Sequence, residues 1–387
     1  MLVISFLSYH IHHVKQVLYN FPKHCYIVIM LHAIILGTRP EIIKLSSLIR
    51  LLQKNQSDFY IIHSNQHYSK EMDEVFFNEL ELPKPKYNLE VGSLDHEEMI
   101  EQIRTKAEAI LTKDKPDIIY VQGDTNTALA GALAGINLNI KVAHIEAGLR
   151  SYDNAMPEEN NRITIDHKAD FLFAPTQKAA DILKNEAIEE TKIHIVGNTI
   201  VDAVYENLSI AKDKIDILTD LNLKSKEYFL LTLHRPSNVD EEKPFIDILE
   251  AISEIYNKYK LPIIFPIHPR TKKQLDKFGL ILPEGIREVE PVGFLEMLLL
   301  EKNAKLILTD SGGIQEEACI LQVPSVTLRF NTERPETLEV GASILAGTDK
   351  NQIIEATQNM LNKETNWPNP FGNGKSAEKI LKITEEI

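Results

Sequence analysis

Short apolar runs alternate with longer amphipathic stretches along most of the chain. Stretches such as residues 97–113 have helical spacing, and the apolar runs between them lack a polar face. Strands buried on both faces have this character, which is typical of parallel sheets covered by helices. The predicted strands of this first set are residues 33–37, 59–64, 117–123, 141–147, 170–176 and 192–198.

The same alternation starts again after the polar stretch "LKSKE" at residues 223–227. The second set of predicted strands covers residues 228–233, 261–267, 304–310 and 323–328. Alternating strands and helices indicate parallel α/β folding, and a chain of 387 residues is long enough for two such domains. We therefore expect an α/β protein with two Rossmann-like, doubly wound domains facing a cleft. The expected domains are residues 31–200 and 201–367, with a final helix in residues 368–387 packing back on the first domain.

The first thirty residues differ from the rest. They are apolar, but His, Lys and Pro22 interrupt them, so no clean span approaches the ~20 residues of a membrane helix. A signal peptide would have an early basic region and a small-residue cleavage site, and this segment has neither. We expect residues 1–30 to be a non-native or disordered extension, produced by a start codon upstream of Met30.

Charge narrows the possible partners. The formal net charge is −14, which argues against nucleic acid or an anionic membrane as the main partner. An anionic small molecule remains compatible, because a few placed Arg and Lys residues can hold one. Only Cys25 and Cys319 occur, so we expect no disulfide framework, and a reducing cytoplasm fits.

Titratable residues follow most of the predicted strands in both halves. Ligands of open α/β sheets bind beyond the carboxyl ends of the strands, so these residues are candidates for lining the cleft. A single polar residue after a strand means little, because loops are polar, but the set favours a functional site. Its members are Arg39, Gln66, His67, Asp124, Glu146, Arg150, His234, Arg235, His268, Arg270, Asp310, Ser311 and Arg329.

The motif "GTRPEIIK" at residues 37–44 links the first strand to a helix. Pro40 suits a first helical turn, which would place Arg39 and Lys44 at the positive end of the helix, where they suit a phosphate. In "HIEAGLRSYDNAMPEENNR", Glu146 follows a buried strand, where desolvation is expected to raise its pKa into a useful range. Glu158 and its neighbour Glu159 are also candidates, but the alternative is that they only complement the dipole of the helix that starts there.

The motif "TDSGGIQEEA" at residues 309–318 ends a strand in two glycines and begins a helix. Backbone N–H groups around Ser311, Gly312 and Gly313 can hold a diphosphate. Glu317 would repel a phosphate at contact, but a carboxylate can accept hydrogen bonds from a ribose diol. The motif therefore predicts a nucleotide, whereas complementing the helix dipole explains Glu316 adequately.

Other familiar signatures are missing. "NGKS" at residues 373–376 lacks the first glycine of a phosphate-binding P-loop, because position 369 is Asn. No G-x-G-x-x-G follows a strand, so we expect no bound cofactor. The histidines at 10, 12 and 13 have no Cys or carboxylate at ligand spacing, and we expect no metal.

Taken in order, the motifs resemble those of the non-hydrolysing UDP-N-acetylglucosamine 2-epimerases. They are "GTRPEIIK", "GDTNT", "HIEAGLRS", "PEENNR", "VGNTIVD", "TLHRPSN", "TDSGGIQEEA" and "TERPE", and the likeness spans residues 31 to about 375. The resemblance implies the two-domain GT-B fold, an isomerase that interconverts UDP-GlcNAc and UDP-ManNAc for polysaccharide or glycan synthesis, and a homodimer. It also implies a glycal-like intermediate, formed when UDP leaves C1 and a proton leaves C2.

The resemblance also implies roles for individual residues. Asp124, Glu146 and Glu158 are the acid/base candidates, and His234 assists the departing diphosphate. The residues implied to contact the phosphates, the sugar or the nucleoside are Arg39, Lys44, Gln66, His67, Arg162, His268, Phe294, Ser311, Gly312, Gly313, Glu317 and Arg329. Which carboxylate removes the proton stays open.

Alternatives remain at this point. The segment "NQHYSKEMD" at 65–73 departs in spacing from the bacterial pattern, which leaves activation by a second UDP-GlcNAc open. "VGSLDHEEM" at 91–99 leaves room for a UDP-2,3-diacetamido uronic acid sugar, while Thr38 favours GlcNAc. A GT-B glycosyltransferase, a hydrolysing epimerase and a non-catalytic nucleotide-sugar sensor are the competing classes.

Overall fold

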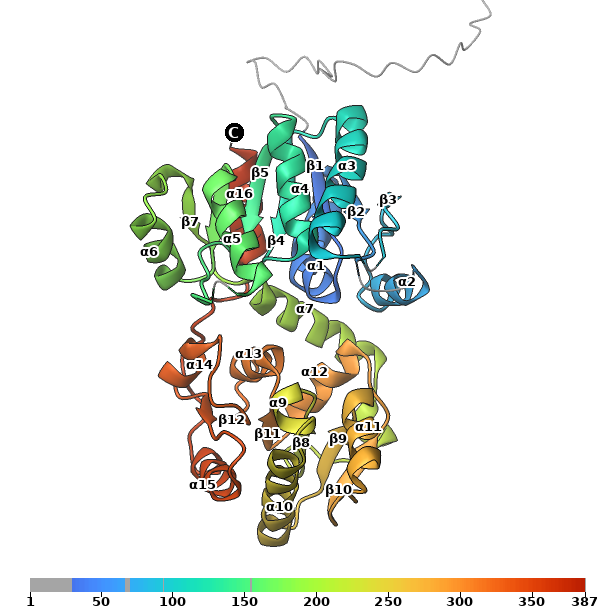
Figure 1. Cartoon of the computed structure of the whole chain (residues 1–387), viewed down its shortest axis with the longest axis vertical. Coiled ribbons are helices and arrows are strands. Elements are labelled where there is room, and N and C mark those ends of the chain that lie inside the picture. Colours follow the sequence, from blue (N-terminus) through green and yellow to red (C-terminus); the bar gives the residue numbers. More distant parts are fainter. Residues whose placement is uncertain (1–29, 67–69, 93, 154, 387) are drawn as a thin grey trace, which may run out of the picture.

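The computed structural model describes residues 30–386 except 67–69, 93 and 154. The extension expected at residues 1–30 therefore lies outside the described residues, apart from Met30. Figure 1 shows two α/β halves, one above the other.

The first sheet has seven parallel strands among the described residues, in the order β3-β2-β1-β4-β5-β6-β7. An order that winds outward in both directions from its first strand is that of Rossmann-like folds. The strands are β1 (Leu31–Leu36), β2 (Asp58–His63), β3 (Tyr87–Asn88), β4 (Ile118–Gln122), β5 (Lys141–Ile145), β6 (Phe171–Ala174) and β7 (Ile193–Ile195).

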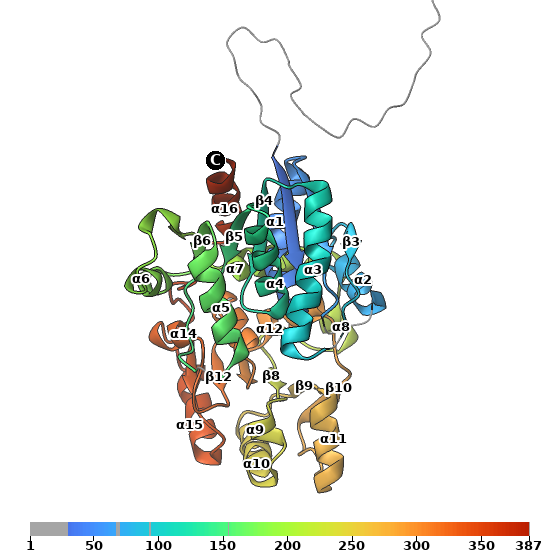
Figure 2. The ribbon, with the colours of Figure 1, turned by 45° about the horizontal axis from the view of Figure 1, so that its top comes forward.

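Helices cover both faces of this sheet, which is why its central strands are apolar throughout. One layer consists of α3 (His96–Asp114), α4 (Asn126–Asn137), α5 (Pro157–Lys168) and α6 (Gln177–Asn185). The other consists of α1 (Arg39–Lys54), α7 (Thr199–Lys214) and α16 (Ser376–Glu385), while α2 (Lys70–Glu79) contacts α1. In Figure 2, α3, α4 and α5 lie in front of α1 and α16.

The second sheet repeats the same winding, in the order β10-β9-β8-β11-β12-β13. All of its pairs are parallel. Its strands are β8 (Phe229–Thr232), β9 (Ile263–Pro266), β10 (Ile286–Val289), β11 (Leu306–Thr309), β12 (Ser325–Thr327) and β13 (Ser343–Leu345).

Helices again cover both faces of the second sheet. The core on one face is built with α10 (Glu242–Tyr259), α11 (Pro269–Phe278) and α15 (Lys350–Leu361), and that on the other with α12 (Phe294–Asn303) and α13 (Gly312–Ile320). Short elements complete the chain: η1 (Glu190–Lys192), α8 (Ile217–Asp220), α9 (Pro236–Val239) and α14 (Pro335–Glu339).

The predicted fold class is confirmed, and every predicted strand corresponds to an observed one. The predictions ran one to three residues too long at most strand ends, because the apolar runs continue into the buried loops. Three strands were missed, namely β3, β10 and β13. They lie at or next to sheet edges, where partial exposure admits polar residues such as Arg287 and Glu288 and breaks the apolar pattern.

One hydrophobic core extends across both halves. It runs from Ile34 and Leu36 of β1 through Val201 and Val204 of α7 to Leu298 of α12. The last helix follows the second half in the chain but packs on the first sheet, where its Thr384 Oγ1 lies 2.8 Å from the hydroxyl of Tyr120 in β4. The exact domain boundaries expected above remain a prediction.

Gly148, in the loop after β5, provides a test of this packing. Its φ is +82°, and an added Cβ would lie 2.4 Å from the carbonyl oxygen of Ala179. We expect Gly148→Ala to lower the free energy of unfolding by about 3 kcal/mol, combining left-handed strain with overpacking. Urea unfolding followed by circular dichroism would measure it.

Gly279 is the matched control, because its φ is +63° and an added Cβ would meet nothing within 4 Å. Gly279→Ala should cost only the backbone strain, about 1 kcal/mol. Equal losses for the two variants would contradict the close approach at Gly148.

Candidate active site

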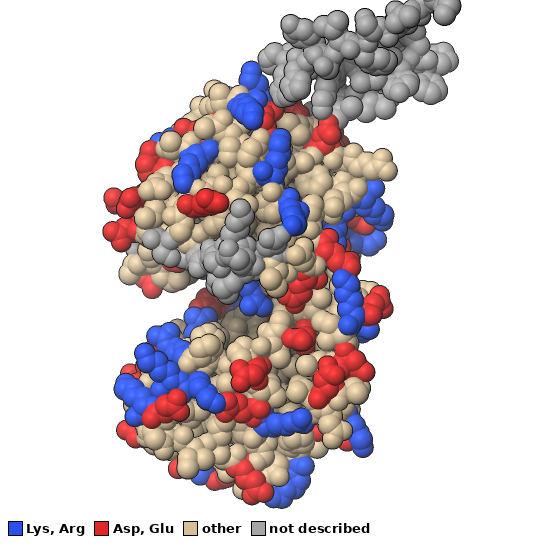
Figure 3. Space-filling view, turned by 90° about the vertical axis from the view of Figure 1, so that its right-hand side faces the viewer, with Lys and Arg blue, Asp and Glu red and all other residues tan. Residues whose placement is uncertain are grey.

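The winding of the two sheets determines where the candidate residues meet. In each sheet the strand order reverses between two central strands, β1 and β4 in the first and β8 and β11 in the second. Such switch points leave a crevice beyond the carboxyl ends of the strands. Arg39 and Asp124 follow the first pair, and His234 and Ser311 follow the second. Figure 3 shows a hollow between the two halves, with Lys and Arg side chains inside it.

Glu146 lies beside the first switch point, directly after β5, which is the neighbour of β4 in the sheet. Its carboxylate accepts hydrogen bonds from Lys44 Nζ at 2.8 Å and 2.6 Å and from Gln122 Nε2. The backbone of Glu146 has φ +71°, an unfavourable conformation for a residue with a Cβ. Such strain persists where the surroundings enforce it, often at functional sites.

The expectation of a raised pKa for Glu146 is wrong. Burial alone would raise it, but Lys44 and Arg334, with Arg162, outweigh burial and hold the pKa below its usual range. The group is therefore an ionised carboxylate at neutral pH, since nearby cations stabilise the charged form.

Asp124 forms an ion pair with Arg162 of α5. Arg162 also donates to Glu159 at 2.8 Å, and Glu159 accepts from the backbone N–H groups of Ser151 and Tyr152, both at 2.9 Å. Glu159 therefore organises the loop before α5 rather than only complementing the helix dipole. Its neighbour in the sequence, Glu158, is exposed in the first turn of the same helix.

The N-terminus of α1 is built as the motif predicted. Arg39 begins the helix and is exposed, and Thr38 caps it. The buried Glu41 accepts from the backbone N–H groups of Gly37 at 3.0 Å and Thr38 at 2.8 Å, and from the hydroxyl of Thr125 at 2.7 Å. Glu41 thus joins the loop after β1 to the loop after β4, so that it fixes Arg39 relative to the segment that carries Asp124.

In the second half, Ser311 caps α13, and the two glycines form the first turn of that helix. An added Cβ would make only ordinary contacts there, the nearest at 3.6 Å for Gly312 and 3.8 Å for Gly313, so neither glycine is tightly covered. Free N–H groups at a helix start that is not tightly covered form an anion site. Glu317 lies about one turn further along α13 and is 9% exposed.

Two histidine rings lie beside this helix start, with centroids 5.5 Å apart. His234 Nδ1 lies 3.0 Å from the buried carboxylate of Asp310, which assigns a proton to Nδ1 and leaves Nε2 for other partners. Burial, with the nearby His234 and Arg270, lowers the pKa of His268, which is therefore neutral at pH 7.

Arg334 connects the two halves across the crevice. It precedes α14 in the second half, and its guanidinium lies 3.7 Å from Glu146 and 3.1 Å from Glu316. Glu316 is buried and also accepts from Asn198 Nδ2 at 3.1 Å. The interpretation of Glu316 as a helix-dipole group is therefore wrong, because it holds Arg334 in place.

Sequence reasoning assigned no role to Arg334. A signal was present, since residues 334–336 repeat the Arg-Pro-Glu triplet of residues 39–41 at the start of another helix. The same triplet contains Glu41, whereas Gln122 had no comparable signal, because its importance depends on a neighbour distant in sequence.

The remaining predicted residues have varied surroundings. Gln66 is buried, and its amide oxygen accepts from the hydroxyl of Thr127 at 2.7 Å, while His67 lies outside the described residues. Phe294 is buried, with its ring 6.4 Å from that of Phe76, over which Arg39 lies at 4.9 Å.

Arg329 forms an ion pair with Glu333 at 2.8 Å. This pair lies next to the first turn of α13, because an added Cβ at Gly312 would lie 3.6 Å from Glu333.

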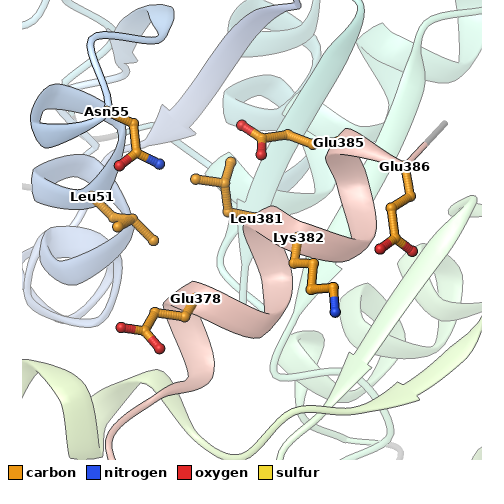
Figure 4. Close-up of a pocket in the computed structure, with 7 residues that line it drawn as sticks. All are labelled: Leu51, Asn55, Glu378, Leu381, Lys382, Glu385 and Glu386. Atoms are coloured by element: carbon orange, nitrogen blue, oxygen red, sulfur yellow. The ribbon is translucent and has the colours of Figure 1, made fainter.

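Within the described part of the chain, no group of three or more His, Cys, Asp or Glu residues is arranged to hold a metal ion. None of the helices in that part of the chain is long and apolar enough to cross a membrane. A separate hollow of about 320 Å³ lies between the end of α1 and α16, lined partly by Leu51 and Leu381 (Figure 4). It is nearly a helix length, about 24 Å, from Arg39, and is not part of the crevice.

Comparison with known proteins identifies relatives over almost the whole chain. The family model described as UDP-N-acetylglucosamine 2-epimerase matches residues 50–385. A Methanocaldococcus jannaschii protein named UDP-N-acetylglucosamine 2-epimerase is 57% identical over 357 residues, covering 91% of this chain and 98% of that protein. A Pseudomonas aeruginosa protein named UDP-2,3-diacetamido-2,3-dideoxy-D-glucuronate 2-epimerase is 38% identical, covering 91% of this chain and 99% of its own length.

Comparison with solved structures leads to the same family. The crystal structure of the M. jannaschii UDP-GlcNAc 2-epimerase in complex with UDP-GlcNAc and UDP has a TM-score of 0.81, covering 92% of this chain and 100% of that chain. With this fold, these motifs and this extent of identity, the chain belongs to the UDP-N-acetylglucosamine 2-epimerase family.

Proposed function

We propose that the chain interconverts UDP-GlcNAc and UDP-ManNAc by inverting C2 of the sugar. The observation that carries the proposal is the contact of Arg334 with both Glu146 and Glu316. It supports the proposal because a single side chain, that of Arg334, bridges Glu146 of the first half and Glu316 of α13, the helix whose N-terminus suits a diphosphate. One sugar nucleotide can therefore reach acid/base groups and a phosphate site together.

The chemistry requires elimination, because the C2 proton of an N-acetylhexosamine is not acidified by a neighbouring carbonyl. The C1–O bond breaks, and its electron pair leaves with the diphosphate of UDP. A base takes the C2 proton, and the C2–H electron pair forms the C1–C2 double bond of a glycal-like intermediate. Return of a proton to the other face of C2 and of UDP to C1 gives the epimer without net oxidation.

The environment of each group supports a role in this sequence. Glu146 is ionised and suits a base, with Asp124 and Glu158 as the other acid/base candidates. Arg39, Lys44 and the N-terminus of α13 suit the developing negative charge on the diphosphate, and His234 suits a donor to it through Nε2. Glu317, behind the glycine turn, suits the ribose.

Several wider features belong to the same proposal. The intermediate holds UDP without a covalent bond, so closure of the two halves around it would exclude water and prevent loss of UDP. We further propose a homodimer in the cytoplasm that supplies ManNAc-type precursors to enzymes transferring UDP-activated sugars.

A second candidate substrate is a UDP-2,3-diacetamido uronic acid. The 38% identity to the Pseudomonas aeruginosa protein named for that sugar favours including it. The elimination chemistry is the same, since it involves only C1 and C2, and the choice depends on contacts to C3 and C6.

The deciding experiment is proton NMR of UDP-GlcNAc with the protein in deuterated water. We expect UDP-ManNAc to appear and deuterium to replace the C2 proton in both epimers, because the proton exchanges with solvent at the base. A parallel sample with the 2,3-diacetamido uronic acid nucleotide compares the two substrates.

Other outcomes of that experiment identify the competing classes. Free ManNAc and UDP would indicate a hydrolysing epimerase. Turnover only after addition of a sugar acceptor would indicate a glycosyltransferase, and binding without turnover a sensor. Any of these would refute the proposal.

Glu146→Gln tests the proposed base. It keeps the shape but removes the charge, so we expect kcat to fall on the order of 10²- to 10⁴-fold with a smaller change in KM. The control is Glu101→Gln, because Glu101 is exposed on α3 and pairs with Arg104 of the same helix. A kcat within about 3-fold of the unmodified protein would remove Glu146 from the proposed chemistry.

Gly312→Ala tests the proposed diphosphate site without disturbing the fold. An added Cβ would come no closer than 3.6 Å to its nearest neighbour, the Glu333 carboxylate, and alanine favours the helix. The thermal midpoint should stay constant or rise, while affinity for UDP, measured by calorimetry, falls more than about 10-fold because the diphosphate cannot approach the backbone. Unchanged UDP affinity would place the diphosphate elsewhere.

A further inference from the structure

Glu301 of α12 is a fully buried carboxyl group that the proposed chemistry does not use. Its residue is 0% exposed. Neither carboxyl oxygen accepts a hydrogen bond from an N–H or hydroxyl group of the described residues. An ionised carboxylate without donors is strongly disfavoured in a protein interior, so Glu301 requires another explanation.

The neighbour of Glu301 is a second carboxyl group, that of Glu317 on α13. The two helices pack against each other, and each of the two residues shifts the pKa of the other, which indicates a hydrogen bond between their carboxyl groups. Two ionised carboxylates are both acceptors, so this bond requires a proton on one of them. Glu317 is 9% exposed and Glu301 is not exposed, so the proton belongs on Glu301 and the charge on Glu317.

We propose that Glu301 is a positioning residue, a neutral hydrogen-bond donor that orients the Glu317 carboxylate toward the ribose of the bound nucleotide. The inference rests on the proposed function, because it takes a UDP-sugar as the ligand. Glu317 lies on the open side of the pair, since its Oε1 is 4.0 Å from where a Cβ at Gly313 would lie. With one direction occupied by the Glu301 proton, the remaining lone pairs face the crevice and can accept from both ribose hydroxyls.

The surrounding charges support this protonation state. Burial, together with the Glu317 charge, raises the pKa of Glu301 well above its usual range. Burial also raises the pKa of Glu317 to about 7, with Glu316 of α13 adding to the rise and Glu301, Arg39 and Lys44 opposing it. Tyr228, before β8, is near enough to Glu301 to feel its charge, but its hydroxyl donates to Leu300 O, and burial raises its pKa and keeps it neutral.

Two substitutions distinguish a role of Glu301 as a neutral hydrogen-bond donor from a role as a buried side chain alone. Glu301→Gln keeps a neutral donor of the same size, whereas Glu301→Leu removes the donor and keeps the volume. Without the donor the pKa of Glu317 rises further, so Glu317 is protonated at neutral pH and accepts poorly from the ribose. The exposed Glu284 supplies the control Glu284→Leu.

The experiment measures affinity for UDP and for 2′-deoxy-UDP by calorimetry between pH 6.5 and pH 9, with circular dichroism to verify folding. At pH 7.5 we expect the unmodified protein, Glu301→Gln and Glu284→Leu to prefer UDP on the order of 10-fold. Glu301→Leu should lose most of that preference and regain it toward pH 9.

The outcomes distinguish this inference from the proposed function. If the unmodified protein binds neither nucleotide, the proposed function fails. If it prefers UDP and Glu301→Leu keeps the same preference at pH 7.5, only the role of Glu301 is overturned. Should Glu301→Leu not fold, Glu301→Gln decides, because loss of its UDP preference would refute a neutral donor.

Discussion

The contact between Glu146 and the cations around it is the interaction on which the crevice depends. Lys44 comes from the first half and Arg334 from the second, and both lie against the same carboxylate. Burying a carboxylate costs several kcal/mol unless opposite charges offset it. The two halves therefore have to approach each other for the charge on Glu146 to be fully compensated, which couples the ionisation of this residue to the relative position of the halves.

The local backbone follows from the same constraint. Glu146 adopts φ +71° directly after β5, and its N–H donates to Phe173 O at 3.1 Å. This turn directs the side chain along the sheet edge toward Lys44 rather than into the next loop. With unstrained backbone angles, the residue at this position would continue the direction of the strand. The ion pairs that the turn permits offset the free-energy cost of the unfavourable conformation.

Two buried glutamates, Glu146 and Glu301, differ in charge, and their neighbours explain the difference. Glu146 is surrounded by cations and is ionised. Glu301 is buried beside another carboxyl group, that of Glu317, and is neutral. In the function that we propose, these two states suit the two ends of one ligand, because the chemistry needs a base near the sugar and the nucleotide needs an oriented acceptor at its ribose.

The sequence alone determined the two parallel α/β halves, since strands covered on both faces have to be apolar and helices between them amphipathic. It also placed Arg39, Asp124, Glu146, His234 and Ser311 at strand ends, because parallel winding brings those ends together. Only the tertiary structure decided the charge of Glu146, the role of Glu316, the link through Arg334 and the pairing of Glu301 with Glu317. A pKa and an ion pair depend on distances of a few ångströms between residues far apart in the chain, and no local pattern of residues encodes those distances.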